Sequence, residues 1–239
     1  MIFYFIQKFF KEWYIILKQI LNIIYPQVCS ICGSINSQAL CSKCNTKLNK
    51  GFSFQTDNYS KDLNKNFVEH HYFFKYENLI RDQIISLKFH EKPYICETIS
   101  NFFKNNKKSF EKLKKYDIII IVPISNERKK ERGYNQSELL IKEIAKITNL
   151  KIMYNILYKN KNTVPQSSLS KIQREKNVKG IYCAKNCEKI RDKKILLVDD
   201  IYTTGSTVNE CARVLTQNKI NRNQIGVLTI AKDWLLYKK

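Results

Sequence analysis

The sequence predicts an α/β fold, in which a parallel sheet is flanked by helices, with a small cysteine-rich segment near the N-terminus. From Tyr116 onward, short apolar runs alternate with segments of helical periodicity, as expected of strands that are buried on both faces. Two Cys-x-x-Cys pairs stand close together before residue 50. The 239 residues suffice for one main domain and a smaller satellite.

The elements of the main domain follow in order along the chain. Buried strands are expected at 117–125, 151–157, 193–200 and 224–232, and helices at 135–148 and 206–218. Before them, 67–76 is expected to be a strand and 79–89 a helix, followed by a helix and a polar loop at 97–113. We therefore expect an N-terminal segment at 1–50, a connecting region at 51–115 and the α/β domain at 116–239.

The N-terminal segment predicts an amphipathic helix. Its polar residues recur at three, four and seven positions and form one stripe: Lys8, Lys11, Glu12, Lys18 and Asn22. It lacks the run of about 20 apolar residues that a membrane span needs, and no signal-peptide cleavage site follows. We therefore expect a cytoplasmic protein with no transmembrane span. The helix packs either on the protein's own body or, through Trp13 and several Phe, at the inner membrane surface.

The net charge of +21 and the sequence pI of about 9.6 favour phosphates, nucleic acid or an acidic membrane as partners. Most of this charge is Lys, and the chain is also rich in Asn, Ile, Phe and Tyr. An AT-rich genome produces the same bias without selection for binding. Charge alone therefore does not establish a nucleic-acid-binding protein.

The two Cys-x-x-Cys pairs have the spacing of a structural zinc site. Four thiolates on two such turns complete a tetrahedral shell, and these are Cys29, Cys32, Cys41 and Cys44. The alternative, a pair of disulfides or a redox motif, needs an oxidising compartment that nothing else in the sequence indicates. Cys96 and Cys211 are expected to be buried small apolar residues, and Cys183 and Cys187 to be structural.

The stretch 195–207, "ILLVDDIYTTGST", joins an apolar strand to a helix through two carboxylates and a series of hydroxyls. Ligands of open parallel sheets bind beyond the carboxyl ends of the strands. Backbone N–H groups at the start of the helix, with nearby hydroxyls, form a cup for phosphate. Asp199 and Asp200 can accept hydrogen bonds from vicinal sugar hydroxyls. A ribose 5-phosphate carries both groups, so we expect a site for it here.

This stretch resembles the thirteen-residue signature of type I phosphoribosyltransferases at every position. The resemblance implies binding of 5-phosphoribosyl 1-pyrophosphate (PRPP) with Mg²⁺. The implied PRPP residues are Asp199, Asp200, Thr203, Thr204, Gly205, Ser206 and Thr207. Arg128 and Arg132, in the loop after the first strand of the domain, would neutralise pyrophosphate. Lys171 and Arg174, in the family's flexible loop, are candidates with Asp199 and Asp200 for the catalytic set, although each basic residue is also compatible with an ordinary solvated loop.

Taken together, the cysteine pairs, "SLKFHEK", "RGYNQSELL", "PQSSL" and the PRPP loop resemble the competence protein F family over nearly the whole chain. The resemblance implies a phosphoribosyltransferase-like protein with zinc and magnesium as cofactors, linked to DNA uptake in natural transformation. Two readings stay open. One is an enzyme that transfers the phosphoribosyl group. The other is a non-catalytic module that keeps PRPP as a ligand and binds single-stranded DNA.

Overall fold

The computed structural model describes residues 13, 21, 24–36, 38–89, 93–124, 136–160 and 177–234. The chain divides into two compact units, Met1–Asn49 and Lys50–Lys239. The polar stripe expected on the N-terminal helix lies outside the described residues. Within the described part of the chain, no helix combines the length and the apolar character that crossing a membrane requires.

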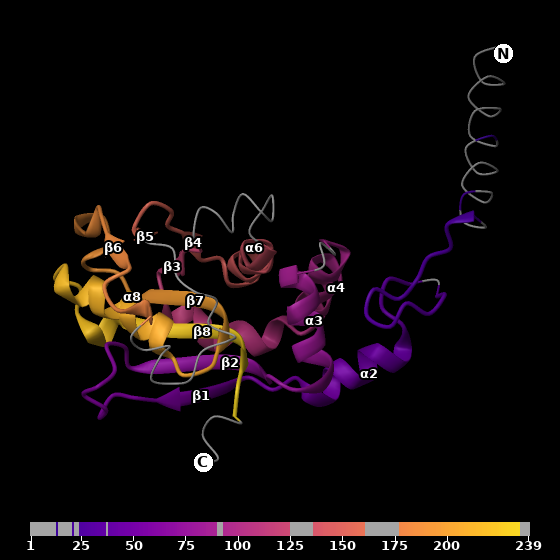
Figure 1. Ribbon diagram of the computed structural model, residues 1–239, viewed down its shortest axis with the longest axis horizontal. Coiled ribbons are helices and arrows are strands. Elements are labelled where there is room, and N and C mark those ends of the chain that lie inside the picture. Colours follow the sequence, from indigo (N-terminus) through magenta and orange to yellow (C-terminus); the bar gives the residue numbers. More distant parts are fainter. Residues whose placement is uncertain are drawn as a thin grey trace, which may run out of the picture. The chain divides into compact units, whose positions relative to one another are not determined.

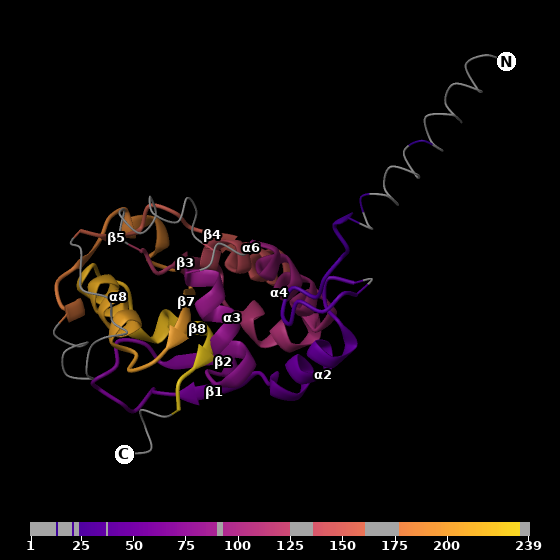
Figure 2. The same cartoon turned by 45° about the vertical axis from the view of Figure 1, so that its right-hand side comes forward.

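The second unit is built on a six-stranded sheet with the order β1-β2-β8-β7-β3-β4. The bounds of these strands are Gln55–Asn58 (β1), Glu69–Lys75 (β2), Ile225–Lys232 (β8), Ile195–Tyr202 (β7), Ile118–Ile121 (β3) and Lys151–Ile152 (β4). All neighbours are parallel except β1, which pairs with β2 in the antiparallel sense. The strand labels follow this order from bottom to top of Figure 1 and Figure 2. The predicted parallel sheet is confirmed.

Helices cover the sheet because its central strands are apolar on both faces. Helix α8 (Ser206–Gln217) buries Val208, Cys211 and Leu215 in one core with residues of β3, β7 and β8. Helix α6 (Gln136–Thr148) packs on β3, β4 and β7. Further helical segments are α3 (Asn78–Phe89), α4 (Pro93–Asn105), η1 (Lys107–Lys115), η3 (Cys187–Ile190) and η4 (Arg222–Gln224), and a short antiparallel pair is formed by β5 (Leu157–Lys159) and β6 (Tyr182–Ala184).

Residues 70–74 of β2, "HHYFF", belong to the core, and their side chains alternate between the two faces. His70 contacts Thr229 Oγ1 through Nε2 at 2.9 Å, whereas His71 contacts Tyr116 Oη through Nε2 at 2.9 Å. On the His71 face, Phe73 lies among the rings of Phe103 and Phe110. These aromatic side chains therefore build the interior of the unit.

Gly226, in the central strand β8, allows Tyr116 to lie directly against the backbone. A Cβ atom at position 226 would stand 1.9 Å from Tyr116 Oη. That hydroxyl also donates to Glu69 Oε2 at 3.3 Å, and burial, followed by the charge of Glu69, raises the pKa of Tyr116. The small residue in the strand thus permits a close approach between ring and backbone.

The structure corrects several expected elements. The strand expected at 151–157 is wrong: β4 ends at Ile152 and β5 begins at Leu157, because Asn155 between them has a φ of 62°. Strand β1 lies in a stretch that shows no periodicity in the sequence. The loop after α4 is a 3-10 helix, η1. Strand β7 begins at Ile195 and continues beyond Asp200 to Tyr202, because its last residues pair with Thr229, Ala231 and Lys232 of β8.

Candidate functional site

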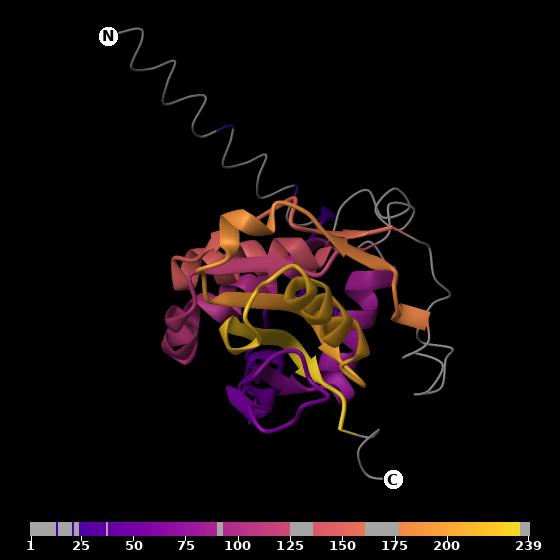
Figure 3. The ribbon, with the colours of Figure 1, turned by 90° about the vertical axis from the view of Figure 1, so that its left-hand side faces the viewer.

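The loop between β7 and α8 presents hydroxyls and a helix N-terminus at one place. Helix α8 begins at Ser206, its N-cap is Gly205 with a φ of 75°, and its first turn carries no acidic residue. Thr204 Oγ1 lies 2.6 Å from Ser206 Oγ and accepts a hydrogen bond from the Ser206 backbone N–H at 3.3 Å. In Figure 3, β7 is drawn in orange and α8 in gold. The backbone N–H groups at a helix N-terminus favour an anion.

Tyr202 forms the floor of this loop. Its side chain is 1% exposed, and its hydroxyl would lie 2.3 Å from a Cβ atom at position 205. The ring stacks on His70 with centroids 4.0 Å apart. Gly205 therefore serves two purposes: it adopts a positive φ, and it leaves room for the tyrosine ring beneath the loop.

The two carboxylates lie within the last half of β7. Both side chains are half-buried, and the Asp200 backbone N–H donates to Asp199 Oδ1 at 2.9 Å. Successive strand residues point to opposite faces of a sheet. Asp199 shares the α8 face, because it alternates with Ile195 and Leu197, which lie in one core with Cys211 of α8. After burial, its charge raises the pKa of the Cys211 thiol. The structure thus brings Asp199, Asp200 and the loop 203–207 together at the carboxyl edge of the sheet. The four basic candidates, Arg128, Arg132, Lys171 and Arg174, lie outside the described residues.

A buried charged group next to this loop has no counterpart in the sequence-based prediction. Lys232 ends β8, its side chain is 7% exposed, and its Nζ lies 2.6 Å from Asp57 Oδ2 in β1. The same Nζ lies 4.4 Å from the ring centroid of Trp234, 5.5 Å from that of Tyr72 and 5.9 Å from that of Tyr202. The single signal in the sequence is a lysine at the end of an otherwise apolar strand.

The surroundings of this lysine shift the pKa values of its neighbours. Asp57 Oδ2 also lies 3.5 Å from His70 Nδ1. Burial opposes the ionisation of Asp57, but hydrogen bonds to His70 and Lys232 and the charge of Lys232 outweigh it and lower the pKa. Burial lowers the pKa of His70 to about 4 against the opposing effect of Asp57, so His70 is neutral at pH 7. The charged partners here are therefore Asp57 and Lys232.

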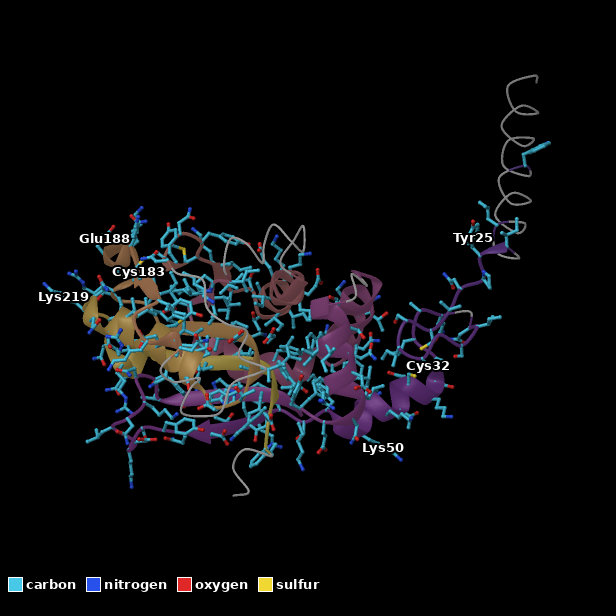
Figure 4. The ribbon with its side chains drawn as sticks, in the orientation of Figure 1. Tyr25, Cys32, Lys50, Cys183, Glu188 and Lys219 are labelled. Atoms are coloured by element: carbon cyan, nitrogen blue, oxygen red, sulfur yellow. The ribbon has the colours of Figure 1, made fainter. Side chains whose placement is uncertain are left out.

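The four N-terminal cysteines form a compact cluster in the first unit. All four Sγ atoms lie within 4.8 Å of one another, and those of Cys32 and Cys41 are 3.8 Å apart. A tetrahedral zinc site with Zn–S bonds of about 2.3 Å has sulfur atoms about 3.8 Å apart. The Cys29 carbonyl accepts the N–H of Gly33, whose φ is 72°, and this closes the first turn. Cys32 is marked in Figure 4 beside the sulfur atoms of the cluster. The cluster is consistent with a zinc knuckle.

The cluster also holds its sulfur atoms ready for a metal. The backbone N–H of Cys41 donates to Cys29 Sγ, and that of Cys44 donates to Cys41 Sγ, each at 3.4 Å. Such bonds favour thiolates, the form that binds metals. The hydrogen bond with the Ser34 hydroxyl lowers the pKa of Cys32 to about 6, whereas burial raises the pKa of Cys44. Of the remaining cysteines, Cys211 is buried as expected, Cys187 is buried too, and the side chain of Cys96 lies outside the described residues.

Curated proteins similar to this chain include two with names that concern DNA or competence. Competence protein F of Haemophilus influenzae is 31% identical over 149 residues, which are 61% of this chain and 64% of that protein. DNA utilization protein YhgH of Escherichia coli is 31% identical over 112 residues, 47% of this chain and 48% of that protein. The chain thus matches less than two thirds of the length of either relative.

The solved structure of adenine phosphoribosyl transferase from Trypanosoma brucei matches with a TM-score of 0.37 and 14% identity, over 80% of this chain and 68% of the other. The family model described as "Phosphoribosyl transferase domain" matches residues 106–233. That range contains β3, β7, the hydroxyl-rich loop, α8 and β8. Because the match spans more than half of the sequence, the chain belongs to the phosphoribosyl transferase domain family, with curated homologues named competence protein F.

Proposed function

We propose that this protein binds PRPP with Mg²⁺ at the stretch 195–207 and acts in DNA uptake. The observation that carries the proposal is the arrangement at the end of β7, where two half-buried carboxylates precede a hydroxyl-rich loop capped by Gly205. The loop 203–207 would hold the 5-phosphate, through the N–H groups of α8 and the hydroxyls of Thr204 and Ser206. Asp199 and Asp200 would accept hydrogen bonds from the ribose hydroxyls.

The same residues support a transfer reaction. Mg²⁺, when bound with PRPP, would supply positive charge to the pyrophosphate oxygens. Asp199 and Asp200 would hold the ribose while positive charge develops at C1. The C1–O bond to pyrophosphate breaks and its electron pair leaves with the pyrophosphate, while the acceptor's lone pair forms the new bond to C1. Fixed charges at the site would stabilise these separating charges. We propose that Arg128 and Arg132 neutralise the pyrophosphate, and that Lys171 and Arg174 meet the charge of the transition state.

The test is a calorimetric titration of the protein with PRPP and Mg²⁺. The wild type is expected to bind, and Asp199→Ala with Asp200→Ala is expected to lose binding by at least tenfold without unfolding. Asp192→Ala is the matched control, because it removes an exposed carboxylate just before the other end of the same strand. Equal binding by the double variant and the control would place the ribose elsewhere. Consumption of PRPP only after a base or nucleic acid is added would favour an enzyme over a non-catalytic binding module.

A second candidate, binding of single-stranded DNA, is favoured by charge and by one relative. Segment η1 carries five exposed lysines against one acidic residue: Lys107, Lys108, Lys112, Lys114 and Lys115. A relative of this chain is named DNA utilization protein. Counterion release gives phosphate-backbone binding a steep salt dependence. We expect the affinity for an oligothymidine to fall at least tenfold between 50 and 200 mM salt, and replacing Lys107, Lys108 and Lys112 with Gln to reduce that slope. A salt-independent affinity would exclude this candidate.

We also propose that the four-cysteine cluster holds a structural zinc ion. Its support is the agreement between the sulfur separations and a tetrahedral shell.

We further propose that the protein is cytoplasmic and that its N-terminal helix can contact the inner face of the membrane. Flotation of the full chain with anionic vesicles tests that contact. Absence of the protein from the vesicle fraction would contradict the proposed membrane contact.

A further inference from the structure

Lys232 is a cation in a place where an unpaired charge is costly. Its side chain is 7% exposed, and it ends a strand in which all eight residues are buried. A buried ammonium group requires a partner to offset its lost hydration. Asp57 supplies that partner at 2.6 Å, and the rings of Tyr72, Tyr202 and Trp234 surround the charge. The ion pair joins residues that are 175 positions apart in the sequence.

The contacts of this ion pair extend to the loop between β7 and α8. Asp57 lies 3.5 Å from the ring of His70, and that ring stacks on Tyr202. The backbone N–H of Asp233, the residue after Lys232, donates to the Tyr202 carbonyl at 2.8 Å. Tyr202 in turn lies directly beneath Gly205. Two routes, one through side chains and one through the backbone, thus connect the ion pair to the floor of the loop.

We propose that Lys232 and Asp57 are positioning residues that fix Tyr202 and thereby preorganise the loop 203–207 for a phosphate group. The edge strand β1 supplies one member of the pair, and the central strand β8 supplies the other. Without the pair, the tyrosine ring can shift, and Gly205 and the first turn of α8 move with it. The inference rests on the proposed function for the identity of the ligand. The effect of the ion pair on the conformation of the loop can be tested without any ligand.

The test uses the full chain with Lys232→Met and Asp57→Asn together, so that no single charge is left buried. We expect the Asn209 amide, which donates to the Gly205 carbonyl at 2.9 Å, to exchange hydrogen at least tenfold faster in the absence of ligand, and the affinity for ribose 5-phosphate to fall at least tenfold. Leu113→Ala is the control for lost stability, because Leu113 is fully buried in η1, which has no contact with the loop among the described interactions. This control is expected to leave loop exchange and affinity unchanged.

Two milder variants keep the test decisive if the double variant does not fold. Asp57→Asn alone retains the shape of the pair and is expected to speed exchange at the same amide. Lys232→Arg retains the charge and is expected to keep exchange as slow as in the wild type. Exchange at the level of the wild type in Asp57→Asn and in the folded double variant would overturn the inference. Failure of the wild type to bind ribose 5-phosphate or PRPP would instead contradict the proposed function, and the exchange measurement would still decide the positioning role.

Discussion

At the scale of single residues, a comparison of two glycines distinguishes two ways in which a side chain can destabilise the protein. One is a strained backbone conformation, and the other is a steric clash. Gly205 and Gly180 have φ angles of 75° and 74°, but a Cβ at 180 meets nothing within 4 Å, whereas one at 205 meets Tyr202. We expect Gly180→Ala to lower the free energy of unfolding by about 1 to 2 kcal/mol, the usual cost of a positive φ for alanine. Gly205→Ala should cost more and should also weaken ligand binding.

Urea unfolding of the two alanine variants measures this difference. A third variant, Gly205→Ala with Tyr202→Leu, shortens the side chain beneath the loop and is expected to recover part of the lost stability. Equal losses in Gly180→Ala and Gly205→Ala would show that the tyrosine ring moves aside without cost. That result would also weaken the positioning role proposed for Lys232 and Asp57.

Single residues were predictable from the sequence where their neighbours in the chain define their role. Asp199, Asp200 and the hydroxyls of 203–207 stand within nine residues, so one strand, one loop and one helix suffice to place them. Asp57 and Lys232 could not be found in this way, because they are 175 positions apart in the sequence. Their strands, β1 and β8, come close only when both join the sheet on either side of β2. The pairing of distant side chains depends on strand order, which local patterns do not contain.

At the scale of elements, the N-terminal knuckle has few means of stability other than the zinc ion that we propose for it. The first unit contains few buried apolar side chains in its described part, namely Cys29, Cys44 and Leu48. Segments of this kind commonly fold only when zinc is bound. We expect a strong chelator to unfold the first unit while the thermal transition of the second remains unchanged. Limited proteolysis with elemental analysis measures the first effect, and thermal melting measures the second.

A cysteine exchange provides the matched comparison. Cys44→Ser is expected to abolish bound zinc and to expose the first 49 residues to protease. Cys183→Ser removes a thiol that lies outside the cluster and hydrogen-bonds to Asn160 instead, so it should retain the metal. Protease resistance of the first unit in the metal-free chain would contradict a structural role for zinc.

The elements that the sequence failed to predict share a physical cause. Strand β1 has only four residues and is mostly exposed, so it lacks the apolar alternation that marks a strand. The break between β4 and β5 depends on the left-handed conformation of Asn155, which its sequence neighbours do not demand. By contrast, α8 and the central strands were predictable because their apolar patterns reflect burial against one another.

At the scale of the whole molecule, two buried histidines make stability depend on pH. Burial lowers the pKa of both His70 and His71 to about 4, whereas an unfolded histidine titrates near 6.5. Between these values the unfolded chain binds more protons, so the free energy of unfolding falls as the pH drops. Each histidine contributes at most about 1.4 kcal/mol per pH unit. Asp57 and Glu69, with lowered pKa values, add a further loss as the pH falls through those values.

Urea unfolding at several values between pH 7.5 and 4.5 measures this dependence. His71→Gln is expected to reduce the slope by about half, since glutamine can keep hydrogen bonds to Thr56 and Tyr116 without titrating in this range. Comparison with the wild type removes the contribution of His90, which lies outside the described residues. An unchanged slope would show that His71 does not remain neutral in the folded protein.

The contact between Gly226 and Tyr116 has a consequence for how the sequence can vary among related chains. No side chain fits at 226 while a tyrosine ring occupies that space, because even a Cβ would lie 1.9 Å from its hydroxyl. A change at 226 must therefore follow, and not precede, a change to a smaller residue at 116. The smaller residue leaves His71 without the phenol that it contacts at 2.9 Å. The order in which substitutions accumulate here is set by sterics, and the three positions should covary as a group.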